Sequence, residues 1–559
     1  MIWSQSYDPL GQQWLSTLLA AAPVVVLLGC IGILQMRAHV AALAGLATAL
    51  VIAIVVFGMP TGLALRAAGF GAAYGLLPIG WIVLNIIFLY QLTNERGQFE
   101  ILRNSIAGIT DDSRLQLLLI AFCLGAFFEG AAGFGTPVAV TGAMLIGLGF
   151  TRLQASGLSL IANTAPVAFG GLGTPIVTLA GVTDLPLLEL SAMIGRQMTL
   201  FSLIVPFWML IAYCGWRRTW EVWPAVLVTA ASFAITQLLI SSLHGPWLTS
   251  IGSALVAIAT LVGFLRVWKP KRIMHVNEAP LTAGDERSLA EDEAGSRKSV
   301  VQPDARALRK AWLPWIILSV VVFIWGLPEV KAFLDGVFRL SLPLSGLDQM
   351  VQRVPPVVAA PEIEKAVYNL NLLSATGTAI LFAAIIGGLL LGAKPLEIAR
   401  TYARTLRTVS ASLLTIAAML ALGYLTRYSG VDATLGLAFA MTGVLYPFFG
   451  TLLGWLGVAV TGSDTASNVL FGSLQKVTAE QLGLSAVLMA GANSSGGVMG
   501  KMIDAQSIVV ASTATRWYGN EGRILRYVFI HSIVLAALVG LVVLLMAYVP
   551  PFTRLVPGG

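Results

Sequence analysis

Two acidic residues interrupt strongly apolar segments of this 559-residue chain. Glu129 follows the apolar run 115–128 and opens the sequence EGAAGFGTPV, and Asp464 lies in the sequence TGSDTASN at 461–468. Burial in a medium of low dielectric constant disfavours the charged form of a carboxyl group, so either side chain could carry a proton. Either could equally serve as a structural acceptor for loose backbone amides. The sequence leaves both roles, and the choice of carrier, open.

An asparagine with hydroxyl neighbours follows each acidic segment at membrane depth. Asn163 begins the sequence NTAP, and Asn493 begins NSSGG. Amide side chains donate hydrogen bonds to carboxylates and accept them from hydroxyl groups. A helix break in hydrocarbon is tolerated only where protein or a wet cavity covers it. We therefore predict that these interruptions form one substrate site, with binding residues Gly135, Thr136, Asn163, Thr164, Ser463, Thr465, Asn493, Ser494, Ser495 and Lys501.

Two Thr-Pro pairs, at 136–137 and 174–175, follow glycine-containing turns. Proline is favoured in the first turn of a helix, so each pair predicts the start of a half-helix. The free amides and the positive dipole end of such a half-helix attract an anion. Ordinary helix capping is the simpler explanation for Thr174.

Lys501 is the buried cation best placed to neutralise a carboxylate substrate. It could instead pair with Asp504, three residues further along a helix. The four histidines are scattered and the three cysteines form no CxxC pair, so we predict neither a metal site nor a cofactor. The sequence also has no Walker loop and no G-x-S-x-G elbow. We therefore expect neither an enzyme nor a pump driven by ATP.

Composition indicates a polytopic membrane protein embedded in a lipid bilayer. Hydrophobic residues make up 57% of the chain and charged residues 11%, whereas a soluble domain has about 25% charged residues. The formal net charge of +7 is carried largely by short loops between apolar spans, as orientation signals are. We therefore expect no nucleic-acid partner, and a homo-oligomer is compatible with this composition.

Apolar runs of about 20 residues predict an all-α fold with about 12 transmembrane helices and two re-entrant hairpins, at 115–150 and 433–476. The polar stretch 268–310 is predicted to be a cytoplasmic linker between two domains, 1–267 and 311–559. The sequence does not place residues 327–372, which contain five prolines. The predicted helices are 15–36, 40–57, 69–92, 157–181, 190–214, 222–242, 247–267, 311–326, 373–392, 408–426, 484–512 and 524–548.

The basic loops fall on one side of the membrane only if both broken regions are hairpins that enter and leave by the same face. This arrangement places both termini on the periplasmic side. It also pairs the helices of the two halves in order and with opposite orientation. An inverted-topology repeat of this kind is typical of secondary transporters, whose site lies at the repeat interface and is formed by discontinuous helices.

These segments closely resemble the bacterial L-lactate permease family. The resemblance extends over nearly the whole chain, and only the linker 273–305 looks particular to this protein. The motifs that carry it are WSQSYDP at 3–9, EGAAGFGTP at 129–137, NTAPVAFG at 163–170, SATGTAILF at 374–382, GWLG at 454–457, TGSDT at 461–465 and GKMI at 500–503.

The resemblance implies symport of L-lactate with protons across the bacterial inner membrane, with D-lactate and glycolate also accepted. It also implies an ion-transporter-like fold with an elevator movement. Lactate is a monoanion at neutral pH, and importing one negative charge against 100 mV costs about 2.3 kcal/mol, which one accompanying proton removes. Phe134 or Phe169 could face the methyl group. The alternatives are sodium-coupled uptake of another small carboxylate and, more distantly, a channel or sensor.

Overall fold

A computed structural model describes residues 2–32, 34, 36–98, 100, 101, 105, 109–131, 136–278, 304–358, 360–517 and 520–557. The all-α membrane fold predicted from the apolar runs is confirmed. The helices of the first half are α1 Gln13–Gly32, α2 Ala38–Val51, η1 Ile52–Val56, α3 Thr61–Tyr74, η2 Gly75–Gly80, α4 Trp81–Glu95, α6 Ser113–Leu117, η3 Leu118–Leu124, α7 Gly125–Ala131, α8 Thr136–Gly147, α9 Arg152–Ala162, α10 Thr164–Val167, η4 Gly171–Gly173, α11 Thr174–Thr183, α12 Leu187–Cys214, α13 Trp216–Trp220, α14 Trp223–Leu243, α15 Thr249–Val267 and η5 Val276–Glu278.

The second half follows the linker, most of which lies outside the described residues. Its helices are α17 Ala305–Gly326, α18 Pro328–Val337, α19 Thr376–Leu390, α20 Pro395–Ser429, α21 Val431–Ala440, η7 Gly443–Leu445, α22 Tyr446–Thr461, α23 Asp464–Gln481, α24 Ala486–Gly500, α25 Ala505–Ala514, α26 Glu521–Tyr548 and η8 Phe552–Leu555.

The number of membrane spans differs from the prediction of about 12. Within the described residues, 10 helices are long and apolar enough to cross a membrane, or 11 if the bent pair Arg152–Val167 and Gly171–Thr183 counts as one span. Two of the 10 are hairpin arms, Ser113–Ala131 and Gly443–Thr461, whereas α1 and α19 contribute only shorter apolar stretches. Hydropathy alone does not separate a hairpin arm from a full span, because both require apolar residues.

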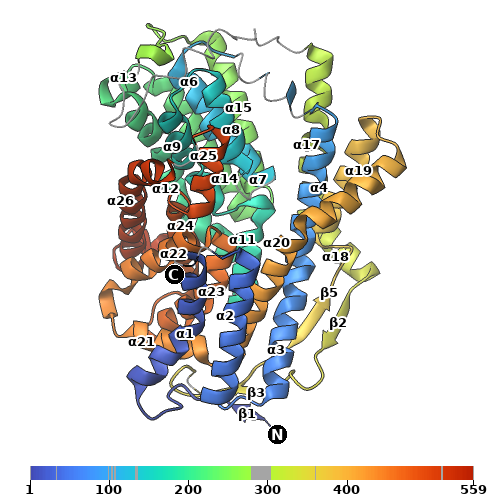
Figure 1. The fold of residues 1–559 in the computed structure, drawn as a ribbon, viewed down its shortest axis with the longest axis vertical. Coiled ribbons are helices and arrows are strands. Elements are labelled where there is room, and N and C mark those ends of the chain that lie inside the picture. Colours follow the sequence, from blue (N-terminus) through green and yellow to red (C-terminus); the bar gives the residue numbers. More distant parts are fainter. Residues whose placement is uncertain are drawn as a thin grey trace.

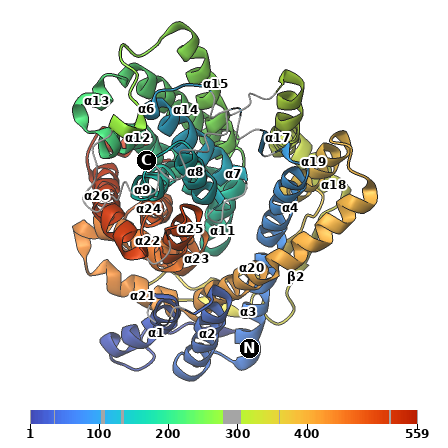
Figure 2. The ribbon, with the colours of Figure 1, turned by 45° about the horizontal axis from the view of Figure 1, so that its top comes forward.

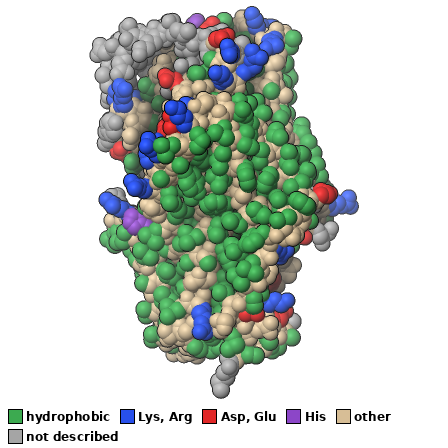
Figure 3. All heavy atoms as spheres, turned by 90° about the vertical axis from the view of Figure 1, so that its right-hand side faces the viewer, with side chains coloured by type: hydrophobic (Ala, Val, Ile, Leu, Met, Phe, Trp, Pro, Cys, Tyr) green, Lys and Arg blue, Asp and Glu red, His purple; other side chains and the backbone are tan. Residues whose placement is uncertain are grey.

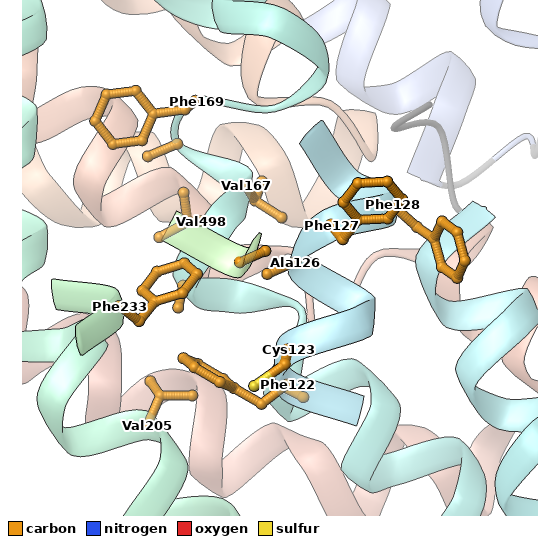
Figure 4. Packing of buried hydrophobic residues seen from close by; sticks show 14 of the residues in the cluster. Phe122, Cys123, Ala126, Phe127, Phe128, Val167, Phe169, Val205, Phe233 and Val498 are labelled. Atoms are coloured by element: carbon orange, nitrogen blue, oxygen red, sulfur yellow. The ribbon is translucent and has the colours of Figure 1, made fainter. Parts of the chain in front are cut away.

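The first predicted hairpin has two arms that pack on each other, one made of α6, η3 and α7 and the other of α8. Protein surrounds the first arm, since 94% of the window Ser113–Ala131 is buried. In Figure 4, Phe122 lies close to Phe233 of α14, and their ring centroids are 5.0 Å apart. Phe127 packs in the same way on Trp315 of α17, at 5.1 Å. This arm therefore ends inside protein, where a break in the helix is tolerated.

The second hairpin is shorter than predicted at 433–476. Its arms are α22 and α23, which turn at Gly462, where φ is +71°. The preceding α21 is a separate helix that packs on α23 and α1. The apolar composition of α21 resembles that of the hairpin arm, which explains the error in the boundary.

The five strands occupy two places that the sequence did not predict. The parallel pair β1 Trp3–Ser4 and β3 Val351–Arg353 is extended by antiparallel β4 Glu362–Ile363. A separate antiparallel pair joins β2 Leu340–Pro343 to β5 Val367–Leu370. In Figure 1, β1 and β3 lie at the same end of the molecule as the N-terminus, and β2 and β5 lie at its side, near α3 and α18.

The helices form two groups when the molecule is tilted (Figure 2). One group contains both hairpins, the broken helices α9–α11 and α24–α25, and the long helices α12, α14, α15 and α26. The other group contains α1–α4, α17 and α19. The 35-residue helix α20 runs between them and packs on α2 and α3 on one side and on α11 and α23 on the other.

Three polar loops meet at one end of the molecule through Arg114. Its guanidinium donates to Asp112 Oδ2 at 2.8 Å, to Glu221 Oε2 at 2.7 Å and to the carbonyl of Arg272 at 2.8 Å. Figure 3 shows that Lys and Arg are most frequent toward this upper end, and that hydrophobic side chains cover the surface below it. The N-terminus lies at the opposite end (Figure 1).

Close backbone crossing explains the glycines of α22 and α24. A Cβ atom at Gly454 would overlap the carbonyl group of Asn493, one at Gly496 would overlap the carbonyl of Thr451, and one at Gly500 that of Trp455. Small residues spaced by four allow helix backbones to approach closely within a membrane. The second hairpin is held against α24 by this contact.

We expect Gly454→Ala to lower the melting temperature of the purified protein in detergent, because the added methyl group forces α22 and α24 apart. Overpacking of this kind costs about 1–3 kcal/mol. Gly69→Ala is the matched control, since Gly69 lies in α3 and a Cβ there meets nothing within 4 Å. Its melting temperature should stay the same or rise, because alanine is the better helix former. Equal melting temperatures for the two variants would contradict the close crossing.

Candidate functional site

The end of α7, the tip of the second hairpin and the breaks of both broken helices converge on one cavity of about 210 Å³. Four of its walls are the end of α7, the segment from α10 to α11, the tip between α22 and α23, and the junction between α24 and α25. The fifth wall is one face of α20. The lining residues are Glu129, Val167, Gly170, Gly171, Thr174, Pro175, Ser412, Thr415, Ile416, Met419, Leu420, Thr461, Gly462, Ser463, Asp464, Thr465, Ala466, Val469, Lys501 and Gln506.

Both predicted carboxylates line this cavity, and each is 4% exposed. Asp464 Oδ2 accepts hydrogen bonds from Ser494 Oγ and, at 3.5 Å, from Asn468 Nδ2. Among the described residues, Asp464 Oδ1 and Glu129 Oε2 have no hydrogen-bond partner. Each carboxylate therefore retains an oxygen that can bind a proton or a ligand.

Lys501 takes both of the positions proposed for it from the sequence. Its Nζ lies 3.3 Å from Asp504 Oδ2 and donates a 2.6 Å hydrogen bond to the carbonyl of Gly462 at the hairpin tip. It also lines the cavity, with 6% of its surface exposed. An ammonium group has three donors, so one is left for a ligand.

Three half-helices begin at the cavity and direct their N-termini toward it. Ser463 caps α23 by accepting from Ala466 N at 3.3 Å, and Asp504 caps α25 by accepting from Ser507 N at 2.7 Å. The N-terminus of α11, which begins at Thr174 as predicted, has no side-chain cap. Its first-turn amides and the positive end of its dipole therefore suit an anionic ligand.

Glycines produce the break that precedes α11. Gly170 has φ of +46° and Gly173 of +76°, which residues with a side chain rarely adopt. A Cβ at Gly173 would also lie 2.8 Å from Cβ of Pro246. As predicted, α9 ends at Asn163, its C-cap residue, and α10 begins at Thr164. A further break follows between Val167 and Thr174.

The second broken helix, in contrast, differs from its prediction. Asn493 lies within the continuous helix α24, and the chain turns only at 501–504, before α25. Both asparagines were expected to mark the breaks because polar residues are costly in hydrocarbon. Asn163 does lie where α9 ends, whereas Asn493 lies several residues before the break, and both are in the packed interior.

The structure separates the predicted binding residues into three sets. Ser463, Thr465 and Lys501 line the cavity together with Glu129 and Asp464. Gly135 lies outside the described residues, as does the side chain of Thr136. The residues that are buried behind the cavity surface are Asn163, Thr164, Asn493, Ser494 and Ser495.

Asn493 is the centre of a hydrogen-bond network behind the second hairpin. Its Nδ2 donates to Asn468 Oδ1 at 2.9 Å and to Ser467 Oγ at 3.4 Å, and its Oδ1 accepts from Gln475 Nε2 at 3.3 Å. Ser495 in turn donates to Gln197 Oε1 at 2.7 Å. These bonds tie α23 and α12 to α24 and support the cavity from behind.

Asn163 differs from its counterpart although the sequence contexts are alike. It is 2% exposed and lies close enough to interact with the Glu129 carboxylate. Neither of its polar atoms has a partner of normal hydrogen-bond geometry among the described residues. Thr164 next to it donates only to the carbonyl of Ile161 of its own helix, at 2.9 Å.

Sequence reasoning missed the wall that α20 provides. Ser412 and Thr415 offer hydroxyl groups, and the apolar side chains are Ile416, Met419 and Leu420. These residues recur at helical spacing on one face, but no break marks α20 and its residues resemble those of any apolar span. Phe169, one of two side chains expected to face the ligand's methyl group, is instead buried away from the cavity, and Phe134 lies outside the described residues.

Comparison with known proteins identifies the family of this chain. The family model described as L-lactate permease matches residues 16–550. The chain belongs to the L-lactate permease family. Among the relatives of this permease, the glycolate permease GlcA of Escherichia coli K12 is 45% identical, with 98% of each chain covered. The L-lactate permease of Salmonella typhi is 43% identical, again with 98% of each chain covered, and that of Bacillus subtilis 168 is 42% identical over 100% of both chains.

The fold of this permease is also similar to a solved membrane transporter, MtrF of Neisseria gonorrhoeae. The TM-score is 0.51, and the match covers 93% of this chain and 96% of that one at 11% sequence identity. At this identity the likeness concerns the fold alone. It agrees with the all-α polytopic membrane fold of the permease.

We expect Asn493→Ala and Asn163→Ala to differ in stability. Removing Asn493 leaves buried partners on α23 unsatisfied, at about 1–3 kcal/mol for each group, so the melting temperature of the purified permease should fall. Removing Asn163 breaks no hydrogen bond of normal geometry among the described residues, so its melting temperature should change much less. Similar losses in the two variants would contradict the supporting role of Asn493.

Proposed function

We propose that this permease imports L-lactate, together with D-lactate and glycolate, in symport with protons across the bacterial inner membrane. The relatives named as L-lactate and glycolate permeases support the substrate class, since they match the chain over nearly its full length. The observation that supports coupling to protons is the set of charged side chains that line the cavity.

The charged residues of the cavity favour an anion only when a proton accompanies it. Among its described lining residues, Glu129 and Asp464 are acidic and Lys501 is the single cation. A monoanionic substrate beside two ionised carboxylates would leave an excess of negative charge that is costly at low dielectric constant. A proton on either carboxyl group reduces this excess by one charge. Binding of the substrate and of the proton therefore stabilise each other.

The size and lining of the cavity suit a small 2-hydroxymonocarboxylate. Its volume of about 210 Å³ is below the ~300–1,000 Å³ of pockets for drug-sized ligands. Lys501 and the uncapped amides of α11 can receive the carboxylate, and Thr465, Ser463 or the α20 hydroxyls can receive the 2-hydroxyl group. Met419 and Ile416 can contact the methyl group of lactate, or the hydrogen atom that replaces this group in glycolate.

The proposed architecture is two inverted repeats, 1–267 and 311–559, joined by a cytoplasmic linker, with both termini periplasmic. The order of elements supports it, since each half contains a hairpin, a broken helix and a long helix in succession. An elevator movement would carry the hairpins and broken helices past α20. The meeting of basic loops around Arg114, at the end opposite the N-terminus, supports this orientation.

Proteoliposomes loaded with the purified permease provide the direct test. An inward pH gradient without sodium should drive accumulation of labelled L-lactate, and unlabelled L-lactate inside should support counterflow without any gradient. A lack of accumulation under the pH gradient would rule out proton coupling. A lack of counterflow in active protein would instead point to a channel or a sensor.

Glu129→Gln should abolish accumulation driven by the pH gradient and leave counterflow intact, because the amide retains the size of the side chain but cannot release a proton. Asp464→Asn is the matched comparison, since Asp464 is the other carboxylate of the cavity. If Asp464→Asn alone separates accumulation from counterflow, Asp464 is the carrier. Loss of Glu129→Gln protein from the membrane would indicate a structural role instead.

Lys501→Met should raise the half-saturating L-lactate concentration for counterflow by about 10-fold or more, since a hydrogen bond to a charged group contributes about 1.5–3 kcal/mol. Lys476→Met is the control, because Lys476 binds the carbonyl of Thr183 at 2.9 Å and lies away from the cavity lining. The melting temperature of each variant distinguishes a binding effect from displacement of the hairpin tip. Unchanged half-saturation in Lys501→Met would exclude Lys501 as the anion partner.

A further inference from the structure

A stripe of buried polar side chains leads from Glu129 away from the cavity. Asn163, Ser159 and Ser156 follow one another on α9 at intervals of four and three residues, which places them on one face of the helix. Their exposed fractions are 2%, 1% and 0%. Burying polar side chains without partners costs free energy that apolar residues would avoid. We therefore expect the stripe to have a function.

The stripe continues through α25 to the start of α26. Ser156 Oγ lies 2.9 Å from Thr515 Oγ1, at the C-terminal end of α25. One turn earlier, Ser512 Oγ donates to Glu521 Oε1 at 2.7 Å. Helices α9 and α25 pack on each other in the upper part of the molecule (Figure 1). The stripe therefore runs from the cavity to the basic loop 516–526.

The half of the stripe nearest the cavity is made of unpartnered polar atoms. Glu129 Oε2, both polar side-chain atoms of Asn163, and Ser159 Oγ have no hydrogen-bond partner among the described residues. Buried polar groups normally have protein or water partners. Side chains three or four residues apart on a helix are about 5–6 Å apart, which matches two consecutive hydrogen bonds through one water molecule.

Gly142 of α8 provides the space beside these atoms. A Cβ atom there would lie 3.5 Å from Thr515 Cγ2 and 3.9 Å from Ser159 Oγ. Gly142 therefore faces the stripe between Ser159 and Thr515. The hydroxyl group of Ser159 has no partner among the described residues, whereas that of Thr515 pairs with Ser156. A larger side chain at this position would occupy the space between α8, α9 and α25.

Hydroxyl groups are the only side chains on the described part of this path that can pass a proton, because titratable groups lie only near its ends. At the cavity end, Glu129 is faced by Asp464, Lys501 and Asp504. The charged or titratable residues on the elements packed around the stripe are Cys123 on η3, Arg152 at the start of α9, Glu189, Arg196, Tyr213 and Cys214 on α12, and Glu521, Arg523, Arg526, Tyr527, His531 and Tyr548 on α26.

We propose that the stripe Asn163, Ser159, Ser156, Thr515 and Ser512 is the proton route between Glu129 and the basic loop at Glu521, which rests on the proposed proton symport. The Glu129 carboxyl group gives its proton to a water molecule held by Asn163. Each hydroxyl group then accepts one proton on its oxygen and passes its own proton on. One proton reaches Glu521 or bulk water, Glu129 becomes a carboxylate, and the hydroxyl groups return to their original protonation.

The test compares Ser159→Ala and Gly142→Val with Gly147→Val in proteoliposomes that contain a pH-sensitive dye. Gly147 lies in the same helix α8, and a Cβ there meets nothing within 4 Å. Ser159→Ala and Gly142→Val should slow proton entry and pH-driven L-lactate accumulation by about 10-fold or more, as loss of a proton-transfer group does, with counterflow unchanged. Ser159→Thr, which keeps a hydroxyl group, should restore proton entry, and Gly147→Val should resemble the unmodified protein.

The outcomes separate this route from the proposed function. If the unmodified protein moves L-lactate without protons, the symport proposal fails. If it moves both and Ser159→Ala does so at the same rate, the route is wrong while symport stands. Ser159→Ala with its Ser159→Thr rescue decides between these outcomes even if Gly142→Val fails to fold.

Discussion

The cost of an unpaired backbone group in hydrocarbon organises this structure. Each such group costs several kcal/mol, so a chain that interrupts its helices must cover every interruption with protein or polar ligand. Here the ends of α7, α11, α22 and α25 meet around one cavity, and the first hairpin arm is enclosed on nearly all sides. The ends of these helices share one polar environment, and the candidate substrate site lies there.

The sequence predicts the parts of this arrangement that depend on local composition. Runs of apolar residues located the helices, and the Thr-Pro pair at Thr174 located the start of α11. The two acidic residues and Lys501 stand out in the sequence because charge inside an apolar segment is costly and usually functional, and the structure places all three on the cavity lining. Local composition also explains why the second hairpin was drawn too long, since α21 is as apolar as its arms.

Other features depend on contacts between distant segments and could not be predicted. Asn163 and Asn493 look equivalent in the sequence, yet Asn493 bonds to three side chains of α23 while Asn163 faces Glu129 without a normal hydrogen bond among the described residues. The wall formed by α20 was missed because only the packing of α20 against α11 and α23 shows that this helix lines the cavity. The role of Gly142 is likewise visible only in the structure, because it depends on the neighbouring residues Ser159 and Thr515 of other helices.

The position of α20 has a consequence for inhibition. Its residues Thr415 and Met419 form one wall of the cavity, while Asp464 and Lys501 on the opposite group of helices form another. A molecule that spans the cavity and contacts both walls at once would fasten the two groups together. If the proposed elevator movement changes the distance between these walls, such a molecule would bind one arrangement of the helices and prevent the others.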